Sequence, residues 1–297
     1  MPNAKLKHYL QLHFLVFIAG FTAILGELIS VGAKDLVWYR MVIASILVFG
    51  YIKYKKLAIR LNAKAIFKFV LAGVLIALHW ITFFEAINQS NVSITLAMFS
   101  TGAFFASFVE PLIHKRRIVW YEIIFGLIVI FGVFLISRGE LHYINGMILG
   151  VVSALLSTLF SVLNGAFIKQ YNATVISFYE FVSGVLFLSV FMVFENGVNA
   201  KFFQISWMDL LYLFILGSIC TAYAFIEAVK VMKYISPYTV ILSYNLEPVY
   251  GIVLAVLLFP ETEIMGIHFY YGVVLVLGTL VLEAILKQRK SIKENAN

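Results

Sequence analysis

The sequence has little charge, a single cysteine and almost no aspartate. Only 12% of its 297 residues are charged, which is about half the share of an ordinary soluble domain. The lone Cys220 excludes a framework of disulfides within the chain. Aspartate occurs only at positions 35 and 209, and the histidines are scattered, so neither a metal-ligand spacing nor a catalytic cluster is present. These shortages argue against a soluble domain and give no reason to expect a metal or a cofactor.

Apolar side chains make up 62% of the chain, with 28 Phe and 16 Tyr, and this composition excludes intrinsic disorder. They gather in ten segments, each close to the ~20 residues that cross a hydrocarbon core. The sequence therefore predicts an all-α polytopic membrane protein with ten transmembrane helices. The segments cover residues 12–30, 36–53, 66–87, 92–113, 118–137, 144–168, 173–194, 207–229, 236–259 and 264–286.

The positive residues are distributed unevenly between the predicted loops. With the N-terminus in the cytoplasm, 18 of the 22 Lys and Arg residues fall on the cytoplasmic side, three fall on the other side, and Arg40 lies inside a segment. This bias follows the positive-inside rule. It predicts a protein of the bacterial cytoplasmic membrane with both termini cytoplasmic. The net charge of +7 then reflects orientation in the bilayer, and no nucleic-acid partner is expected.

The two halves of the sequence repeat one another. Similar residues recur in order at an offset that grows from 140 to 146, and the steps fall between matched segments, where loops tolerate insertions. Five segments form each repeat, so the second must cross the membrane in the opposite sense. We expect two inverted five-helix repeats, 1–138 and 139–297. The matches are Tyr39-Arg40 with Tyr179-Glu180, Glu85-Ala86 with Glu227-Ala228, Thr95 with Thr239, and Gly126 and Gly132 with Gly272 and Gly278.

Short motifs in this order resemble the EamA-like members of the drug/metabolite transporter superfamily. The resemblance implies a multi-pass carrier of a small metabolite, often an exporter, with a central cavity lined by segments one to four and six to nine. The chain departs from the family at the end of segment four, where Glu110-Pro111 stands in place of a frequent Gly-Glu. The motifs are Tyr39-Arg40, Ala86, Gly126, Gly132, Ala228, Ser236-Pro237, Glu247-Pro248-Val249, Glu261, Gly272 and Gly278.

A carboxylate and a proline lie together in the middle of segment nine. Glu247 precedes Pro248, whose missing N–H frees the carbonyl of Tyr244. That carbonyl, the Asn245 amide and the Glu247 carboxylate would then share one short stretch, as in the broken helices of transporter binding sites. We predict substrate binding by Glu247, Asn245 and Tyr244. The alternative is a packing kink in which Glu247 bonds to a neighbouring helix.

Other polar or aromatic residues at membrane depth extend the predicted substrate site. His79 and Trp80 lie just past the middle of segment three, where an aromatic wall is expected. Ser100 and Thr101 lie in segment four, which carries a ridge of small residues. A structural role for His79 and Trp80 in the protein core is the alternative.

Three further ionisable residues are expected to serve gating or coupling, because charge inside a bilayer is expensive. Glu27 lies near the outer end of segment one, Arg40 in the outer third of segment two, and Glu180 in the inner third of segment seven. Arg40 and Glu180 are repeat mates and are therefore not expected to pair. Because deep acids outnumber Arg40, the interior suits a cationic or ammonium-bearing solute, or a coupling proton carried by a carboxyl group.

The function predicted from these features is secondary transport of a small amino-acid-like or cationic, amphipathic solute. We expect export by alternating access. The expected partners are the lipid bilayer and, in a homodimer, a second copy of the chain. The alternative is an integral-membrane enzyme acting on a lipid-soluble substrate, which would need a catalytic cluster near one interface.

Overall fold

The computed structural model describes residues 6–115, 117–195, 197, 200–235, 237–244 and 246–296, and these contain helices and no strand. A π-helical turn, η3 (Ser218–Tyr223), joins α9 to α10, and two 3₁₀ turns, η1 (Leu141–Tyr143) and η2 (Ala200–Phe203), lie in loops. The α-helices are α1 (Leu6–Leu28), α2 (Ala33–Lys55), α3 (Ala63–Gln89), α4 (Val92–Phe99), α5 (Gly102–His114), α6 (Trp120–Gly139), α7 (Ile144–Phe167), α8 (Ala173–Phe194), α9 (Trp207–Gly217), α10 (Ala224–Val231), α11 (Pro237–Tyr244), α12 (Glu247–Leu258) and α13 (Ile267–Ala296).

Eight helical stretches in the described residues are long and apolar enough to cross a membrane, so the prediction of a polytopic helical protein is confirmed. The predicted count of ten is not confirmed, because 247–258 and 267–282 are shorter apolar helices. Predicted segment nine is divided into α11 and α12. Pro248 stands in the first turn of α12, where a missing N–H costs nothing, so the proline begins a new helix here.

Several helices begin at side chains that accept a hydrogen bond from the first free backbone N–H groups. Asn62 caps α3, Asn91 caps α4, Asn172 caps α8 and Ser206 caps α9. Asparagine and serine are among the best residues for this position, because their short side chains reach back to the helix start. These caps set where the hydrophobic helices begin.

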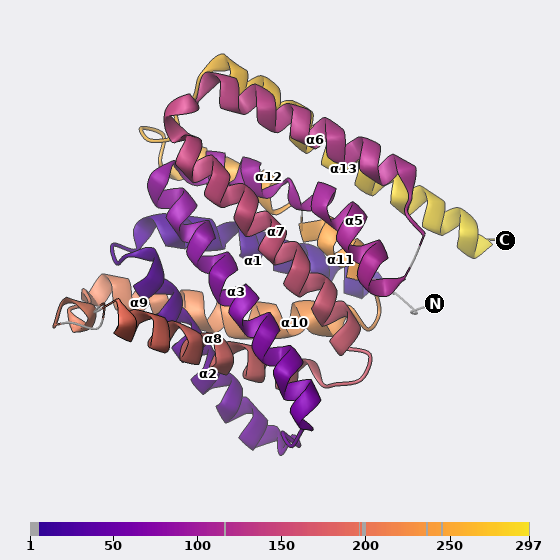
Figure 1. Cartoon of the computed structure of the whole chain (residues 1–297). Coiled ribbons are helices and arrows are strands. Elements are labelled where there is room, and N and C mark those ends of the chain that lie inside the picture. Colours follow the sequence, from indigo (N-terminus) through magenta and orange to yellow (C-terminus); the bar gives the residue numbers. More distant parts are fainter. Residues whose placement is uncertain are drawn as a thin grey trace.

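The helices of the two halves pack against one another across the bundle (Figure 1). In the first half, α3 packs against α7 and α8 of the second half. In the second half, the segment from α9 to α10 packs against α1 and α2 of the first. The last helices of the halves, α6 and α13, lie side by side along one edge. This reciprocal packing matches the predicted repeat order.

Glycines allow the closest of these helix contacts. A Cβ atom on Gly132 of α6 would lie 3.1 Å from the carbonyl oxygen of Gly272 in α13, and one on Gly272 would lie 2.6 Å from that of Gly132. A Cβ on Gly20 of α1 would lie 3.0 Å from the backbone nitrogen of Gly251 in α12. Such distances leave no room for a larger side chain, as is usual where helices touch in lipid.

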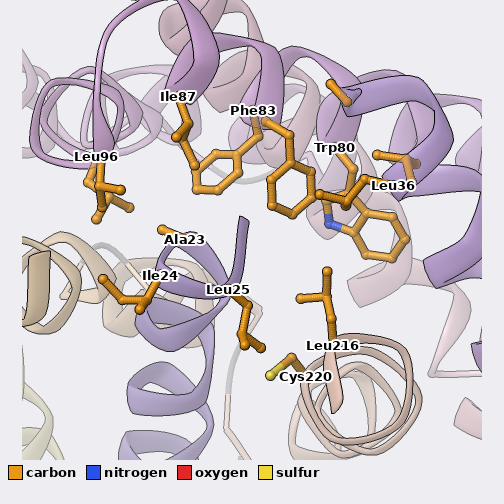
Figure 2. Close-up of a cluster of buried hydrophobic side chains, with 14 of the residues drawn as sticks. Ala23, Ile24, Leu25, Leu36, Trp80, Phe83, Ile87, Leu96, Leu216 and Cys220 are labelled. Atoms are coloured by element: carbon orange, nitrogen blue, oxygen red, sulfur yellow. The ribbon is translucent and has the colours of Figure 1, made fainter. Parts of the chain in front are cut away.

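The largest apolar core runs through the centre of the bundle. Its buried side chains come from α1, α2, α3, α4 and the α9–η3 segment, among other elements. Figure 2 shows part of it, with Leu25 of α1, Trp80 of α3 and Leu216 of α9 among the labelled side chains. These contacts bring segments far apart in the sequence around a common centre.

The two ends of the bundle differ in charge. The basic end holds the lysine-rich termini of α2, α3 and α10, with Lys55, Lys64, Lys68, Lys230 and Lys233. The opposite end holds the α1–α2, α3–α4 and α12–α13 connections. Positive-inside bias predicts that the basic end faces the cytoplasm.

Carboxylates tie the connections together at the opposite end. Asp209 accepts hydrogen bonds from the Ser30 backbone N–H (2.8 Å), the Ser30 hydroxyl (2.7 Å) and the Ser206 hydroxyl (2.6 Å). These bonds join the end of α1 to the start of α9. Since α1 and α9 belong to different halves, Asp209 links the halves at this end.

A second set of bonds holds the start of α4. The buried Glu263 accepts the backbone N–H groups of Val92 and Ser93, each at 3.1 Å. Glu140 accepts the Gly266 N–H at 2.7 Å, which anchors the same α12–α13 connection to the end of α6. The connections at the opposite end are therefore fixed by backbone-to-carboxylate bonds.

Candidate functional site

A cavity of about 140 Å³ lies at the centre of the bundle, between the two halves. Among the described residues, α6, α8, α9 and α13 contribute nothing to its wall. The family resemblance implied that segment seven would line the cavity, and this expectation is wrong because no described residue of α8, which packs against α3 and α2, reaches the cavity wall. The wall consists of Ala19, Thr22, Arg40, His79, Trp80, Phe83, Phe99, Gly102, Ala154, Ser157, Thr158, Phe160, Ser161, Asn164, Cys220, Ala224, Phe225, Ala228, Val229, Met232, Val240, Tyr244 and Glu247.

Arg40 is the positive group of the cavity and is only 3% exposed. Its Nε donates a hydrogen bond to the Thr221 hydroxyl, and its guanidinium carbon lies 3.9 Å from the centre of the Trp80 ring. Its Nη1 atom is buried without a hydrogen-bond partner. Burying a guanidinium N–H without an acceptor costs free energy, so the Nη1 of Arg40 is a donor available to an anionic group.

The π-helical turn explains how Arg40 is held. The Thr221 hydroxyl donates to the Leu216 carbonyl five residues earlier, at 2.6 Å, while it accepts the Arg40 Nε–H. A regular α-helix would direct residue 221 elsewhere, because its hydrogen bonds span four residues. Single π turns recur at functional sites, and this one places a hydroxyl against the guanidinium.

Glu247 is the negative group of the cavity and is also buried. It begins α12 at the break after α11, where the sequence predicted an interrupted helix. Within the described residues, no hydrogen bond or ion pair joins its carboxylate to another side chain, Arg40 included. Two opposite charges therefore face one cavity without neutralising each other by direct contact. Tyr244, at the end of α11, lines the same wall.

His79 and Trp80 also line the cavity, as the sequence predicted, but His79 is fixed by a structural contact. Its Nδ1 lies 2.8 Å from the Ser153 hydroxyl of α7, and that hydroxyl lies 3.1 Å from the His79 carbonyl. The imidazole stacks on Phe99 at 5.6 Å between ring centres. His79 thus links α3 to α7 and forms part of an aromatic wall.

Aromatic side chains that the sequence did not single out complete this wall. Phe160 of α7 and Phe225 of α10 stack at 6.0 Å between ring centres, and Phe225 also lies near Trp80. The sequence offers no signal for these positions, because they are two of 28 phenylalanines. Phe83 of α3 also lines the cavity.

Two other predicted substrate residues, Ser100 and Thr101, do not line this cavity. Ser100 and Thr101 are buried and donate their hydroxyls to the Leu96 and Met98 carbonyls, whereas their neighbours Phe99 and Gly102 face the cavity. These hydroxyls satisfy the backbone at the break between α4 and α5. Asn245 lies outside the described residues.

The predicted gating residues lie at different depths. Arg40 lines the cavity, while Glu27 is exposed in the last turn of α1, near the opposite end of the bundle. Glu180 is fully buried in α8, where one carboxylate oxygen lies 3.4 Å from the amide nitrogen of Asn164 and the other has no partner. Asn164 lines the cavity, so it stands between Glu180 and the cavity. As expected for repeat mates on separate helices, no ion pair joins Arg40 to Glu180 in the described residues.

The small-residue ridge of α7 divides into two parts. At Gly146 and Gly150 an added Cβ would lie 2.6 Å from Ser90 and 2.8 Å from Met98, so this part packs tightly. Ser157 and Ser161, farther toward the basic end, line the cavity. A large residue at Gly150 would therefore push the helices apart, whereas one at Ser157 would extend into the cavity.

Comparison with known proteins agrees with this multi-pass architecture. The model of the EamA-like transporter family matches residues 7–138 and 144–284, so the chain belongs to the EamA-like transporter family and the predicted resemblance is confirmed. A crystal structure described only as that of a protein superposes with a TM-score of 0.68 at 12% identity, covering 95% of this chain and 99% of the other. That similarity shows the fold alone. No curated protein matches the sequence.

Family membership places the chain among membrane transporters and favours transport over the enzyme alternative. No group of three or more His, Cys, Asp or Glu residues that could hold a metal ion occurs in the part of the chain that the structure describes.

Proposed function

We propose that the protein exports a small amphipathic, amino-acid-like solute across the bacterial cytoplasmic membrane by alternating access. The observation that carries the proposal is the pair of buried, opposite charges, Arg40 and Glu247, in one aromatic cavity. Because acids outnumber Arg40 in the segments, the sequence predicted an interior suited to a cationic or ammonium-bearing solute, or to a coupling proton. Among the acids that the structure describes, only Glu247 lines the cavity, so the site is balanced and suits a zwitterion.

Each part of such a solute has a partner in the wall. The free Nη1 of Arg40 would donate to a carboxylate, and the Glu247 carboxylate would accept from an ammonium group. An apolar side chain would lie against Trp80, Phe160 and Phe225. The Thr221 hydroxyl keeps the guanidinium in place for this contact.

Export is supported by the position of the cavity along the bundle. Its wall includes Asn164, Met232 and Val240, which belong to the basic end. At the opposite end, Asp209 and Glu263 hold the connections together. A solute would therefore load from the cytoplasm, and release would require the bonds at the opposite end to open. In this proposal the halves form a five-plus-five inverted repeat, with α11–α12 and α13 as the last two spans, and this repeat supplies the symmetry for such an exchange.

The test is transport into proteoliposomes of an apolar amino acid, compared with its N-acetyl and its amide derivatives. Glu247→Gln keeps the size of the side chain and removes its charge. We expect the amino acid to bind 10- to 100-fold more weakly, as for a lost hydrogen bond to a charged group. The N-acetyl derivative, which lacks the ammonium, should be unaffected by the substitution.

Arg40→Gln provides the complementary variant, and Glu261→Gln is the matched control because Glu261 is exposed and does not line the cavity. Arg40→Gln should remove the preference for the free carboxylate over the amide. If Glu247 instead carries a coupling proton, Glu247→Gln should retain binding and lose the dependence of transport on a pH gradient. Wild-type transport and pH dependence in Glu247→Gln would reject both roles and redirect attention to His79 and Glu27.

A further inference from the structure

A second and larger cavity opens on the side of the bundle, near the basic end. It has a volume of about 640 Å³ and lies between the end of α2, the start of α8 and the segment from η3 to α10. It shares no lining residue with the central cavity. We call it the lateral groove.

The lateral groove has a basic rim at one end. Lys55 at the end of α2, Lys230 in α10 and Lys233 just after α10 line it, and all three are exposed. Glu227 is the one acid in its wall; it accepts a hydrogen bond from Lys230 at 2.9 Å and another from Gln11 at 2.6 Å. Because three lysines and one carboxylate, which is already hydrogen-bonded, line this rim, its net charge is positive.

The rest of the groove is apolar and open to the surroundings of the bundle. Leu47 and Tyr51 of α2 and Tyr223 of η3 line it and are 38%, 47% and 47% exposed. Ile226 of α10 contributes to the floor. These residues belong to membrane-spanning stretches, so their exposed surfaces face lipid. The groove therefore combines an apolar channel at bilayer depth with lysines at the membrane surface.

We propose that the lateral groove binds one anionic phospholipid. Its phosphate group lies between Lys55, Lys230 and Lys233, and an acyl chain lies along Leu47 and Ile226. One anionic phospholipid fits both parts of the groove. Clustered lysines at a membrane surface attract its anionic headgroup, and the apolar part of the groove accepts its acyl chain. A free phosphate would satisfy the lysines and leave the apolar part exposed.

The lateral groove and the central cavity share one structural wall. Ser218, Ala222 and Tyr223 of η3 face the groove, whereas Cys220 of the same π turn lines the central cavity. Thr221, between them, holds Arg40. A lipid in the groove thus packs against the turn that positions the solute-binding guanidinium, and its removal should weaken solute binding as well as stability.

The experiment is a binding and melting titration of the purified full-length chain in a neutral detergent. Phosphatidylglycerol, phosphatidylcholine and inorganic phosphate are added separately, and bound lipid is counted by native mass spectrometry. We expect phosphatidylglycerol to raise the melting temperature and remain bound as a single molecule. Phosphatidylcholine and inorganic phosphate should do neither at the same concentrations.

The variant Lys55→Gln/Lys233→Gln removes two rim charges and leaves the Lys230–Glu227 pair intact. Its half-saturating concentration of phosphatidylglycerol should rise about tenfold or more. Lys64→Gln/Lys68→Gln removes the same charge from exposed lysines of α3 outside the groove and should bind as the wild type does. Equal binding of both phospholipids, an equal loss in the control variant, or full stabilisation by inorganic phosphate would overturn the proposal. Because binding is measured without transport, the result is independent of the proposed solute.

Discussion

The two parts of α7 show how the two ends of the bundle differ. Toward the opposite end, Gly146 and Gly150 bring α7 against α3 and α4 with no space between the helices. Toward the basic end, Ser157, Ser161 and Asn164 of the same helix face the central cavity. One helix with one run of small residues therefore closes the bundle at one end and leaves it hollow toward the other.

The connections reinforce this difference. At the opposite end, carboxylates of Asp209, Glu263 and Glu140 accept backbone N–H groups from neighbouring connections. Toward the basic end, the central cavity and the lateral groove leave space in the bundle. Alternating access would require the closed end to open and the hollow end to close. Loss of the bonds at the opposite end should therefore favour opening at that end.

The largest expected effect comes from the two parts of the α7 ridge. Gly150→Leu forces a branched side chain against Met98 and should lower the free energy of unfolding by about 3 kcal/mol, as overpacking does in a filled interior. Ser157→Leu extends into the cavity and should change it by less than about 0.5 kcal/mol, as at sites away from packed contacts. Thermal melting in detergent measures both. Equal loss of stability in the two variants would show that Ser157 faces a packed contact.

Removing Asp209 tests whether the opposite end is held closed. Asp209→Ala loses three accepted hydrogen bonds and should cost about 2 kcal/mol, since bonds to charged groups are the stronger ones. The only cysteine of the chain, Cys220, lines the central cavity and reports the opening. A membrane-impermeant maleimide added at the opposite end should label Cys220 faster in the variant than in the wild type.

Asp35→Ala is the control for this experiment. Asp35 lies near the same end, in the first turn of α2, and no hydrogen bond in the described residues joins its side chain to another connection. Labelling that is unchanged in Asp209→Ala, or equally accelerated in Asp35→Ala, would show that Asp209 is not a latch.

Thr221→Val examines the π turn, with a smaller expected effect. The substitution keeps the shape of the side chain and removes the hydroxyl that accepts the Arg40 Nε–H. Solute affinity should fall about fivefold to tenfold, which corresponds to one ordinary hydrogen bond. Thr158→Val is the matched control, because Thr158 lines the central cavity and its hydroxyl donates to the Ala154 carbonyl of its own helix at 2.9 Å, with a longer contact of 3.4 Å to the Gly102 carbonyl. A similar fall in both variants would assign no special role to Thr221.

The smallest effect is expected at Glu263, where it depends on pH. Burial raises the pKa of the Glu263 carboxyl above its usual 4.5, although hydrogen bonds from Ser93 and Val92 act in the other direction. A raised folded-state pKa contributes stability that is complete below the unfolded-state value and is lost as the pH rises through the folded-state value. The stability advantage of the wild type over Glu263→Gln should therefore shrink from pH 4 upward.

Glu261→Gln, two residues away and exposed, is the control for this titration. Melting curves of the three proteins across pH 4 to 8 would reveal the trend. An advantage that grows with pH would mean that Glu263 is stabilised as a carboxylate in the folded protein.

Sequence reasoning succeeded where one residue carries its own physical signal. Glu247 was predicted from its depth and from the adjacent Pro248, and it does line the cavity at a helix break. His79 and Trp80 were identified because they are unusual at membrane depth. Ser100 and Thr101 were predicted to bind substrate but do not line the cavity, because small hydroxyl residues also satisfy backbone carbonyls inside a helix. Their roles in transport, like those of the other candidates, stay predictions.

The sequence by itself determined that this chain is a helical membrane protein, which end of it is basic, and that its halves repeat, because hydrophobic length, lysine position and residue order are properties of the chain alone. Only the tertiary structure decided which helix faces meet. It placed Arg40 against Thr221 and Trp80, separated Glu180 from the cavity by Asn164, and divided the α7 ridge between packing and solute space. In an apolar segment every face suits lipid or protein, so hydropathy does not show which face is buried in the bundle. Close contacts between helices that are distant in the sequence decide it.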